Sequence, residues 1–443
     1  MNHRRQSRRS FLKSVSTVAL ASPFIASCTT TRPRPNTLRH ASFGADGMAW
    51  NDLTAIASHP AVRIVAVCDV DLSRTGKVRE RFPNARIYQD WRELLQNESK
   101  NLDSVNVSTP DHMHAPIAMS AMQQGKHVYV EKPLAHDLHE VRRMTELARS
   151  RKIVTQMGIQ VHSMTKYRMA VDLIQRGTIG KVREVHCCCE KSWGDSNPKP
   201  NRRDPIPVGL DWELWLGVCQ DRPFIGDEYY HPVNWRKRLD FGTGTLGDMG
   251  CHILDPVHEA LQLGAPISIQ SEGPPPNSWN WPVASRVHYT FPGTHYTAEE
   301  GLRVTWYDGT IKLPTEVTSL LDEDEMPGTG SLWVGTEGVM LLPHISWPQF
   351  YPQTKFQDLE FPEIEGTDHW TQFVEACLGN GQTSAPFVYS GPLTETILLG
   401  GIASRFPNTT LGWDSEQMKF DVLEADAFLE RRYRKGWQIK DLS

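Results

Sequence analysis

The feature that most constrains the fold is a regular alternation of short apolar strands and helical segments over residues 38–158. The pattern predicts helices of roughly ten residues between strands at 38–43, 63–68, 104–108, 127–130 and 154–158. Alternating strands and helices are typical of βαβ units, whose parallel strands form one doubly wound sheet. We therefore predict an α/β domain of this kind over residues 38–155.

The remainder of the chain has a different pattern. Longer strand-like stretches are separated by loops rich in Trp, Pro and Gly, and late helices are predicted at about 367–379 and 391–405. This order is typical of an α+β domain with a mostly antiparallel open sheet. We predict such a domain over residues 156–443. We expect it to bind the substrate and, through an exposed sheet face, to form a homo-oligomer.

The N-terminus resembles a bacterial export signal. Residues 7–13 (SRRSFLK) are similar to the twin-arginine motif, and a modest apolar stretch follows at 15–26. Residues 25–28 (IASC) resemble a lipobox, in which the cysteine is lipidated; a basic arm and an ordinary signal-peptidase site are the alternatives. We expect a signal peptide over 1–28, a linker over 29–37, and a periplasmic protein anchored to the membrane through Cys28.

Composition excludes several classes of function. The 443 residues carry a formal net charge of −5, which gives no electrostatic reason to bind nucleic acid. No apolar run reaches the roughly 18 residues that a membrane-spanning helix needs. The cysteines form no C-x-x-C pair or zinc pattern. The run Cys187–Cys189 lies in a strand-like stretch, where we expect small buried side chains.

A glycine-containing turn follows the first predicted strand. Residues 44–49 (GADGMA) occupy the place of the G-x-G-x-x-G/A loop that binds the pyrophosphate of a dinucleotide. Asp46 stands where the second glycine of this pattern belongs, so a side chain and a negative charge lie where the backbone normally approaches the pyrophosphate. We predict a Rossmann-type domain with cofactor contacts from Gly44, Asp46, Gly47 and Met48.

An acidic residue, Asp69, ends the second predicted strand, about 20 residues after the glycine loop. A carboxylate at this position accepts hydrogen bonds from the adenosine ribose and repels a 2′-phosphate, so we predict NAD rather than NADP as the cofactor. The other interpretation is a helix cap. The two interpretations, a ribose contact and a helix cap, are compatible if Asp69 contacts the ribose while Asp71 or Ser73 caps the next helix.

Residues 108–114 (STPDHMH) directly follow the strand predicted at 104–108. They would lie at the carboxyl edge of the sheet, where doubly wound folds bind their ligands. We predict cofactor contacts from Ser108, Thr109, Pro110 and His114. No metal site is predicted, because no carboxylate or cysteine cluster accompanies the two histidines of this segment.

Residues 131–133 (EKP) complete a set of motifs. Together with the glycine loop, Asp69 and the segment 108–114, they resemble the Gfo/Idh/MocA (glucose–fructose oxidoreductase/inositol dehydrogenase) family. The later segments 247–255 (GDMGCHILD) and 392–395 (PLTE) resemble it too, so the likeness covers nearly everything after residue 37. It implies an NAD-dependent oxidoreductase that acts on a secondary hydroxyl of a sugar or sugar derivative.

The resemblance also implies the catalytic residues. Lys132 would lie at the nicotinamide end of the cleft, with Glu131, and would hydrogen-bond the reacting hydroxyl of the substrate. Asp248 and His252 are four residues apart, so on a helix they share one face. His252, with an ordinary pKa near 6.5, would take the hydroxyl proton, and Asp248 would orient the substrate or the imidazole. The alternative for His252 is a core histidine.

Pro256 complicates the helix that carries this pair, because proline is unfavourable inside a helix. Either the helix kinks there, or Asp255 caps a second helix that begins at Pro256.

The segment Tyr230–Arg236 (YHPVNWR) is predicted to line the cleft. Its aromatic rings suit the C–H surfaces of a sugar, so we predict substrate contacts from Tyr230 and His231. Trp235 and Arg236 are predicted to contact the cofactor, where Arg236 would reach the nicotinamide ribose or the phosphates.

Export narrows the expected chemistry. Free NAD is not expected outside the cytoplasm, so an exported enzyme should hold its cofactor tightly and regenerate it in each cycle. A redox-neutral, NAD-dependent glycosidase, which oxidises its substrate transiently to allow elimination, is therefore the second hypothesis. The third hypothesis is a non-catalytic, lipid-anchored sugar-binding module. It is suggested by Asp46, which stands in place of the second glycine of the cofactor loop. A pure binding protein would not need Lys132, Asp248 and His252.

Overall fold

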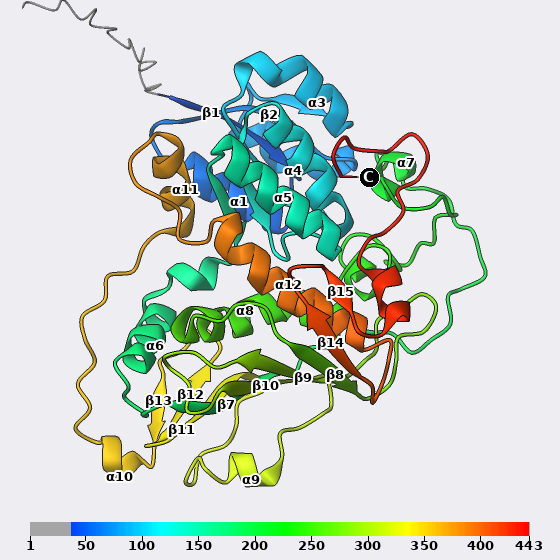
Figure 1. Ribbon diagram of the computed structural model, residues 1–443. Helices are drawn as coiled ribbons and strands as arrows, with labels where there is room; N and C mark the ends of the chain where they lie inside the picture. The colour runs from blue at the N-terminus through cyan, green and yellow to red at the C-terminus, as the bar shows by residue number, and fades with distance from the viewer. Residues whose placement is uncertain (1–36, 443) are drawn as a thin grey trace, which may run out of the picture. The chain divides into compact units, whose positions relative to one another are not determined.

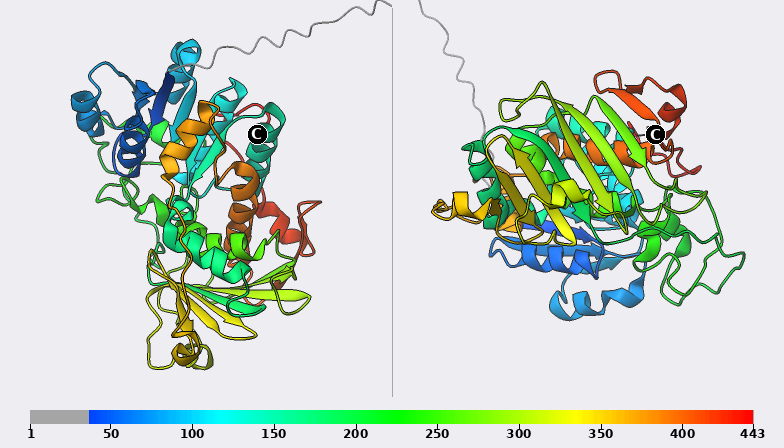
Figure 2. Two further views of the ribbon diagram at one scale, coloured as in Figure 1. Left: turned by 90° about the vertical axis from the view of Figure 1, so that its left-hand side faces the viewer. Right: turned by 90° about the horizontal axis from the view of Figure 1, so that it is seen from below.

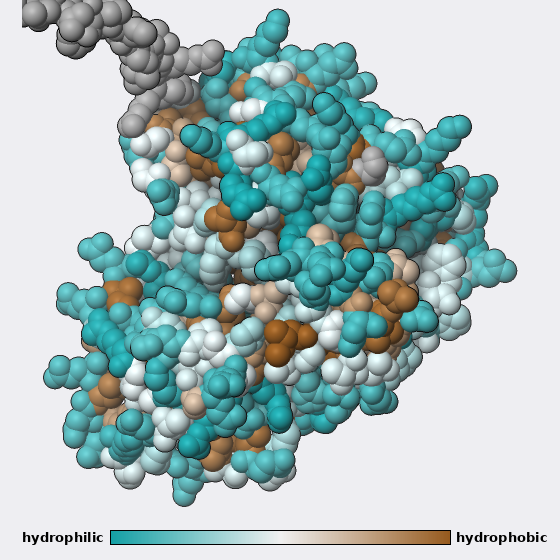
Figure 3. Space-filling view, in the orientation of Figure 1, coloured by the Kyte–Doolittle hydropathy of each residue, from teal (hydrophilic) through white to brown (hydrophobic). Residues whose placement is uncertain are grey.

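The computed structural model describes residues 37–442. The predicted signal peptide, including the twin-arginine motif and Cys28, lies outside the described residues. Within residues 37–442, no helix combines the length and the apolar character needed to cross a membrane. Figure 3 shows that the face seen in that view is mainly hydrophilic, with small scattered hydrophobic patches.

The first sheet is parallel throughout, as the alternation of strands and helices predicts. Its strand order is β3-β2-β1-β4-β5-β6, so the order reverses between β1 and β4. The strands are β1 (Leu38–Phe43), β2 (Val62–Cys68), β3 (Arg86–Tyr88), β4 (Ser104–Val107), β5 (His127–Glu131) and β6 (Thr155–Gly158). A crevice at the carboxyl ends of the strands, where the order reverses, is the usual ligand site of such a sheet.

Helices cover both faces of this sheet (Figure 1). Those within the Rossmann-type domain are α1 (Met48–Ala57), α2 (Gly76–Arg81), α3 (Trp91–Glu98), α4 (His114–Gln123) and α5 (Leu138–Arg151). Two helices from the end of the chain pack against it as well. Helix α11 (His369–Cys377) contacts α1, and α12 (Phe387–Ala403) contacts α5.

The second sheet has nine strands among residues 37–442, in the order β13-β12-β11-β7-β10-β9-β8-β14-β15. It is mostly antiparallel, as predicted, and the pair β7–β10 is parallel. Its strands are β7 (Val182–Cys189), β8 (Ser268–Glu272), β9 (Arg286–Pro292), β10 (Gly301–Asp308), β11 (Thr329–Gly335), β12 (Val339–Pro343), β13 (Gln349–Tyr351), β14 (Thr410–Asp414) and β15 (Lys419–Phe420).

Helices cover one face of this second sheet (Figure 2). The covering helices are α12, α6 (Thr165–Gln175) and α8 (Gly244–Leu261). The loops contain three short helices, α7 (Trp212–Leu216), α9 (Thr315–Thr318) and α10 (Gln353–Phe356). The three consecutive cysteines Cys187–Cys189 on β7 are buried and free, as expected of small apolar side chains.

Helix α8 runs without interruption through Pro256. The interpretation that Asp255 caps a second helix is therefore wrong. The Asp255 carboxylate instead accepts hydrogen bonds from His162 Nδ1 at 3.0 Å and from the Tyr389 hydroxyl at 2.6 Å. Packing of α8 against α6, α12 and the sheet outweighs the hydrogen bond that proline removes.

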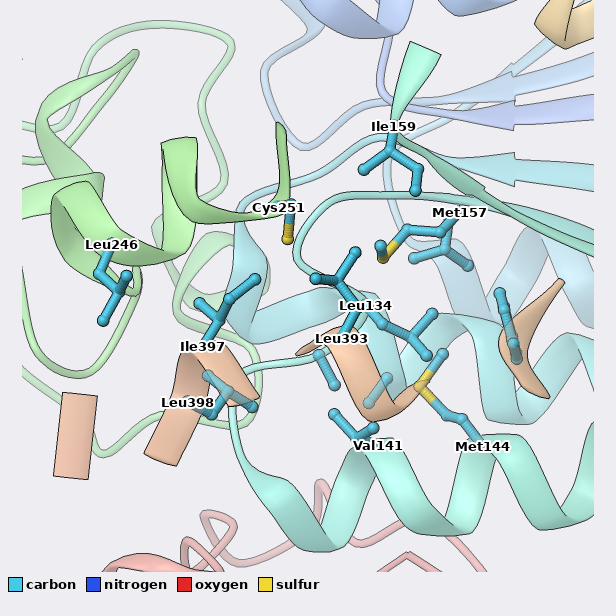
Figure 4. Close-up of a cluster of buried hydrophobic side chains, with 14 of the residues drawn as sticks. Leu134, Val141, Met144, Met157, Ile159, Leu246, Cys251, Leu393, Ile397 and Leu398 are labelled. Carbon is cyan, nitrogen blue, oxygen red and sulfur yellow. The ribbon is translucent and has the colours of Figure 1, made fainter. Parts of the chain in front are cut away.

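The core where α5, α8 and α12 meet fixes the position of α8 (Figure 4). Cys251 of α8, Leu393 and Ile397 of α12, and Val141 and Met144 of α5 are each at most 1% exposed. Close packing of this kind leaves little freedom for the helix as a whole. The other face of α8, which carries Asp248 and His252, is thereby held in place.

Candidate active site

A cleft of about 360 Å³ lies at the carboxyl ends of the parallel strands. Apart from Tyr230, every predicted site residue lines it: Gly44, Asp46, Gly47, Met48, Asp69, Ser108, Thr109, Pro110, His114, Glu131, Lys132, His231, Trp235, Arg236, Asp248 and His252. Residues that are more than 200 positions apart in the sequence thus contribute to one site.

The predicted substrate contact of Tyr230 is wrong. Its side chain is 2% exposed and packs against Trp212, Trp215 and Phe241, with ring centres 5.3–6.0 Å apart. The sequence shows an aromatic residue in a polar segment but not the aromatic cluster that draws the ring inward.

His231 lines the cleft, but at the end formed by β2. Its Nε2 lies 3.1 Å from a carboxylate oxygen of Asp71, two residues beyond Asp69. The structure therefore places His231 beside the residues predicted for the adenosine ribose, and not beside Lys132 as a substrate contact.

The glycine loop has the geometry of a pyrophosphate cradle. Gly44 has a φ of 107°, and a Cβ there would lie 2.8 Å from the Ser108 carbonyl oxygen, so no other residue fits. Gly47 precedes α1, which has neither a side-chain cap nor an acidic residue in its first turn. The N–H groups of this turn can thus bind an anion, which fits the phosphates of a dinucleotide.

Asp46 is held by two cations on the neighbouring segment. Its carboxylate lies 2.9 Å from the Arg74 guanidinium and 3.0 Å from the Lys77 ammonium. Partial burial would raise the pKa of the carboxyl group, but these partners keep it below its usual value. The negative charge that motivates a non-catalytic interpretation is therefore balanced within the protein.

Asp69, at the end of β2, stabilises the glycine loop through a hydrogen bond. One of its oxygens accepts a hydrogen bond from the Ala45 N–H, and the other accepts one from the Asp71 N–H, both at 2.9 Å. Burial raises the pKa of Asp69 to about 6. Asp71 caps the next helical turn by accepting from the Ser73 N–H at 3.1 Å, which leaves Asp69 at the cleft.

The loop after β4 is tied to the EKP segment by His114. Its Nδ1 lies 2.8 Å from the Pro133 carbonyl oxygen, and its Nε2 lies 2.8 Å from that of Thr109. The buried Thr109 hydroxyl, which lines the cleft, has no hydrogen-bond partner among the described residues. A buried polar atom of this kind fits a bound ligand, because proteins rarely leave one unpaired.

A charged cluster lies at the end of β5. The Lys132 ammonium donates to both the side chain and the main-chain oxygen of Asp248, each at 2.7 Å. The second Asp248 oxygen accepts from Trp193 Nε1 at 2.7 Å, and Arg236 Nε lies 3.3 Å from the first. Asp248 therefore orients the Lys132 ammonium, whereas the sequence suggested that it orients the substrate or His252.

Electrostatics keep Lys132 positively charged. Burial alone would lower its pKa, but the charges of Asp248 and Glu131, together with the hydrogen bond to Asp248, outweigh that effect and raise it. In turn, Lys132 and Arg236 hold the pKa of Asp248 far below its usual value, against the effect of burial. Lys132 can thus stabilise negative charge on a substrate oxygen, but it cannot serve as a neutral base.

His252 lies one turn beyond Asp248 on α8, as predicted. Burial, and then the charge of Lys132, lower its pKa well below the ordinary value of 6.5, so the expectation of an unshifted pKa is wrong. Its buried Nδ1 has no hydrogen-bond partner among the described residues. A neutral imidazole with a free nitrogen is suited to accept a proton from a substrate hydroxyl.

Sequence reasoning missed Gln160, which lines the cleft, and three residues that contact its lining: Trp193 beside Asp248, His344 beside His252, and Asp52 beside Ser108. Trp193 lies in an irregular loop, and His344 follows β12, so no motif marks either one. Gln160 donates to Glu131 at 2.6 Å, and the fully buried Asp52 accepts from Ser108 at 2.7 Å. Of these residues, Asp52 alone had a sequence signal, because a carboxylate among the apolar residues of a helix is unusual. Burial raises its pKa to about 7.

Within residues 37–442, no group of three or more His, Cys, Asp or Glu side chains is arranged to hold a metal ion.

Comparison with known proteins agrees with this geometry. Residues 38–159 match the oxidoreductase family with an NAD-binding Rossmann fold (Gfo/Idh/MocA), and residues 191–297 match its C-terminal alpha/beta domain. The WlbA dehydrogenase from Bordetella pertussis, solved with NADH and UDP-GlcNAcA, has a similar fold. The TM-score is 0.60 at 15% identity, over 85% of this chain and 99% of that one.

Curated relatives match over shorter stretches. Levoglucosan dehydrogenase from Pseudarthrobacter phenanthrenivorans is 24% identical over 197 residues, which are 44% of this chain and 41% of that protein. Alpha-N-acetylgalactosaminidase from Shewanella oneidensis is 26% identical over 159 residues, which are 34% of each protein. The matches thus span less than half the length of these two relatives. From the two family matches and the shared fold, the chain belongs to the Gfo/Idh/MocA family of oxidoreductases, with an NAD-binding Rossmann domain followed by an alpha/beta domain.

Proposed function

We propose that the protein is an NAD(H)-dependent oxidoreductase that acts on a secondary hydroxyl of a sugar or sugar derivative. The observation that carries this proposal is the buried Lys132–Asp248 pair beside the neutral His252, at the β5 end of the NAD cleft. Bound NAD would supply a hydride acceptor there. A levoglucosan dehydrogenase among the relatives supports a carbohydrate as the substrate.

The chain's own residues account for the proton and charge movements. The Lys132 ammonium, oriented by Asp248, donates a hydrogen bond to the substrate oxygen and stabilises the charge that develops on it. His252 accepts the hydroxyl proton. Because burial, and then the charge of Lys132, disfavour a positive charge on His252, its proton is held weakly and is readily returned to the substrate or to solvent.

Cofactor binding is assigned to the opposite part of the cleft. The first turn of α1, after Gly44 and Gly47, would hold the phosphates of the cofactor. Asp69 would bind its adenosine ribose, and the Thr109 hydroxyl would bind a further polar group of the cofactor. We propose that the protein retains this cofactor and regenerates it within each cycle, as export would require. A redox-neutral glycosidase is the second candidate, because an alpha-N-acetylgalactosaminidase is among the relatives.

Native mass spectrometry of the mature protein, followed by absorbance of the bound nicotinamide, tests this function. The probes are levoglucosan, myo-inositol and p-nitrophenyl glycosides. Lasting reduction without cleavage supports the oxidoreductase, whereas steady cleavage without net reduction supports the glycosidase. A protein that binds sugars but carries no dinucleotide, and shows no absorbance change with any probe, would be a binding module, and the proposal would be wrong.

Cofactor choice gives the first prediction. NAD is expected to bind at least about tenfold more tightly than NADP, on the order of 1.4 kcal/mol, because the Asp69 carboxylate repels a 2′-phosphate. Burial raises the Asp69 pKa to about 6, so the carboxyl group loses its charge as the pH falls through that value. The preference should therefore shrink at acidic pH, as measured by calorimetry with both cofactors.

The Asp69→Asn variant is the matched test of this assignment, since it removes the charge and keeps the shape. Its NAD-to-NADP preference should be smaller than that of the wild type and should change less with pH near 6. An unchanged preference in this variant would show that another group selects the cofactor.

Localisation gives the second prediction. We propose export by the twin-arginine route and a lipid anchor at Cys28, because residues 7–13 and 25–28 carry both motifs. Changing Arg8 and Arg9 to Lys should trap the precursor in the cytoplasm, and Cys28→Ser should release soluble protein from the membrane fraction. Fractionation and immunoblotting measure both, and unchanged distributions would count against the proposal.

A homo-oligomer is also proposed, because helices cover one face of the nine-stranded sheet and leave the other open (Figure 2).

A further inference from the structure

A second cavity, of about 520 Å³, shares no lining residue with the active-site cleft. It lies between the start of α5, the second half of α12 and the segment 427–432 near the end of the chain. Helix α12 also contacts the helical turn Leu423–Phe428 directly before that segment (Figure 1). The volume is in the range of cavities that bind small organic molecules, so its polar groups indicate what it can hold.

Arg405, two residues beyond the end of α12, supplies a cation to this cavity. Among the described residues, its guanidinium has no hydrogen bond and no ion pair, and burial lowers the Arg405 pKa below its usual value. The guanidinium carbon lies 4.5 Å from the ring centre of Phe428 and 5.4 Å from that of Trp281. Such ring contacts use the flat face of the group, so the N–H donors in its plane stay free for an anion.

Trp281 is fixed before any ligand arrives. Its Nε1 donates to the Gly242 carbonyl oxygen at 2.7 Å, and its main-chain N–H donates to that of Lys237 at 2.9 Å. A Cβ at Gly244 would lie 2.9 Å from Trp281 Cγ, so the ring also packs against the first residue of α8. Arg405 thus contacts a preorganised surface, which reduces the conformational entropy that binding would cost.

A second polar group of the cavity lacks a partner. His136, beside the residue that caps α5, lines the cavity, and its buried Nε2 has no hydrogen-bond partner among the described residues. Burial, and then the charge of Arg431, lower the His136 pKa well below its ordinary value, so the ring is neutral. The charge of Arg405 lowers it further. A neutral imidazole nitrogen donates or accepts according to its tautomer, and a hydroxyl group satisfies it in both roles.

The carboxylates that line the cavity have other partners or are exposed. Asp137 lies 3.6 Å from Arg431, and Asp240 forms an ion pair with Arg222. The two remaining charged residues of the lining are exposed and opposite in sign, Glu430 and Arg432. Within residues 37–442, Arg405 is therefore left as a half-buried cation without a counter-ion.

We propose that this cavity is a second binding site whose ligand is a sugar acid, with its carboxylate on Arg405 and a hydroxyl on His136. A carboxylate accepts two parallel hydrogen bonds from a guanidinium and supplies the missing counter-ion. A hydroxyl group supplies the partner that His136 Nε2 lacks. The Trp281 and Phe428 rings offer apolar contacts to the C–H surface of the sugar. Binding there requires no redox step, so it is independent of the chemistry in the cleft.

Modification of arginine by phenylglyoxal localises the binding. NAD-loaded protein is treated with and without glucuronate or galacturonate, and the modified peptides are identified by mass spectrometry. Both sugar acids should protect Arg405, whereas the exposed Arg203, which lines neither cavity, should react equally in all samples. Glucose lacks the carboxylate and acetate lacks the hydroxyl groups, so each should protect Arg405 at least about tenfold less at equal concentration.

Calorimetry with glucuronate measures the contribution of each side chain. Arg405→Met should weaken binding by about 10–10²-fold, the range for a hydrogen bond to a charged group. His136→Phe keeps a ring without the nitrogen and should weaken it by about two- to tenfold. Arg203→Met should bind like the wild type. Binding that persists unchanged in Arg405→Met belongs to the cleft.

Thermal unfolding separates binding from a structural role. Without ligand, Arg405→Met should unfold near the wild-type temperature, because no ion pair is lost. Glucuronate should raise the unfolding temperature of the wild type more than that of Arg405→Met. A large loss of stability in the variant without ligand would show that the guanidinium serves the fold, and the proposal would be wrong.

Two further results overturn the second site. Protection of Arg405 by acetate equal to that by glucuronate would indicate a site for any small anion and not for a sugar acid. No protection by either sugar acid, or glucuronate affinity that is unchanged in both Arg405→Met and His136→Phe, would show that the cavity does not bind this class of ligand.

Discussion

Replacement of Lys132 with methionine is expected to lower turnover by about 10²–10³-fold, the usual effect of removing one group that stabilises charge in a transition state. Methionine fills a similar volume but cannot donate a hydrogen bond to the substrate oxygen. The Asp248 carboxylate would still be held by Trp193 at 2.7 Å, so the site should keep its shape. Nicotinamide reduction in a single turnover measures the loss.

Lys126 offers a matched control for this variant. It is also a largely buried lysine of the Rossmann domain, but its ammonium donates to the main-chain carbonyl oxygens of Ser99 and Leu102 and not to a cleft residue. Lys126→Met should lower stability and leave the rate of reduction near the wild-type value. Dinucleotide binding should survive in both variants, and an equal loss of rate in the two would mean that Lys132 acts through the fold alone.

The parallel sheet could be predicted because its signal is local. Five of its strands are apolar runs of four to seven residues, each followed by a helix or a turn with its own pattern. Strand β3 and helix α3 were missed. Strand β3 spans Arg86–Tyr88, three residues that are exposed or half-buried, and an apolar pattern is not visible over so short a segment.

The cofactor half of the site could be predicted from the sequence as well as the parallel sheet could. Gly44, Asp69 and Thr109 lie at the ends of neighbouring parallel strands, and such ends meet at one edge of the sheet by construction. Their position in the cleft therefore follows once the strands are identified.

The substrate half depends on contacts between distant segments. His344 reaches His252 across 92 positions of the sequence, and the hydrogen bond from Trp193 to Asp248 joins a loop to a helix. The shifted pKa of His252 depends on burial by several elements, which no motif encodes. For the same reason, Tyr230 resembles a sugar-binding residue in the sequence and is a core residue in the fold.

Arg431 and Tyr433, near the end of the chain, are expected to stabilise the fold through a buried carboxylate of helix α5. The Arg431 guanidinium donates to Glu140 of α5 at 2.6 and 2.8 Å, and the Tyr433 hydroxyl donates to the same carboxylate oxygen at 2.6 Å. Glu140 is 1% exposed, and Asp137 also faces this group. Arg431→Met should lower the free energy of unfolding by about 3–5 kcal/mol, because it leaves buried carboxylates without a cation.

Urea unfolding followed by tryptophan fluorescence measures this loss, and the neighbouring Arg432 provides the control. Arg432 is exposed, so Arg432→Met should change the free energy of unfolding by no more than about 0.5 kcal/mol. Removing the partner as well should recover part of the loss, since an apolar pair replaces a buried ion pair at little cost. Arg431→Met combined with Glu140→Leu should thus be more stable than Arg431→Met alone. If Arg431→Met is as stable as Arg432→Met, the Glu140 carboxylate does not depend on Arg431, and the C-terminal segment contributes through apolar packing.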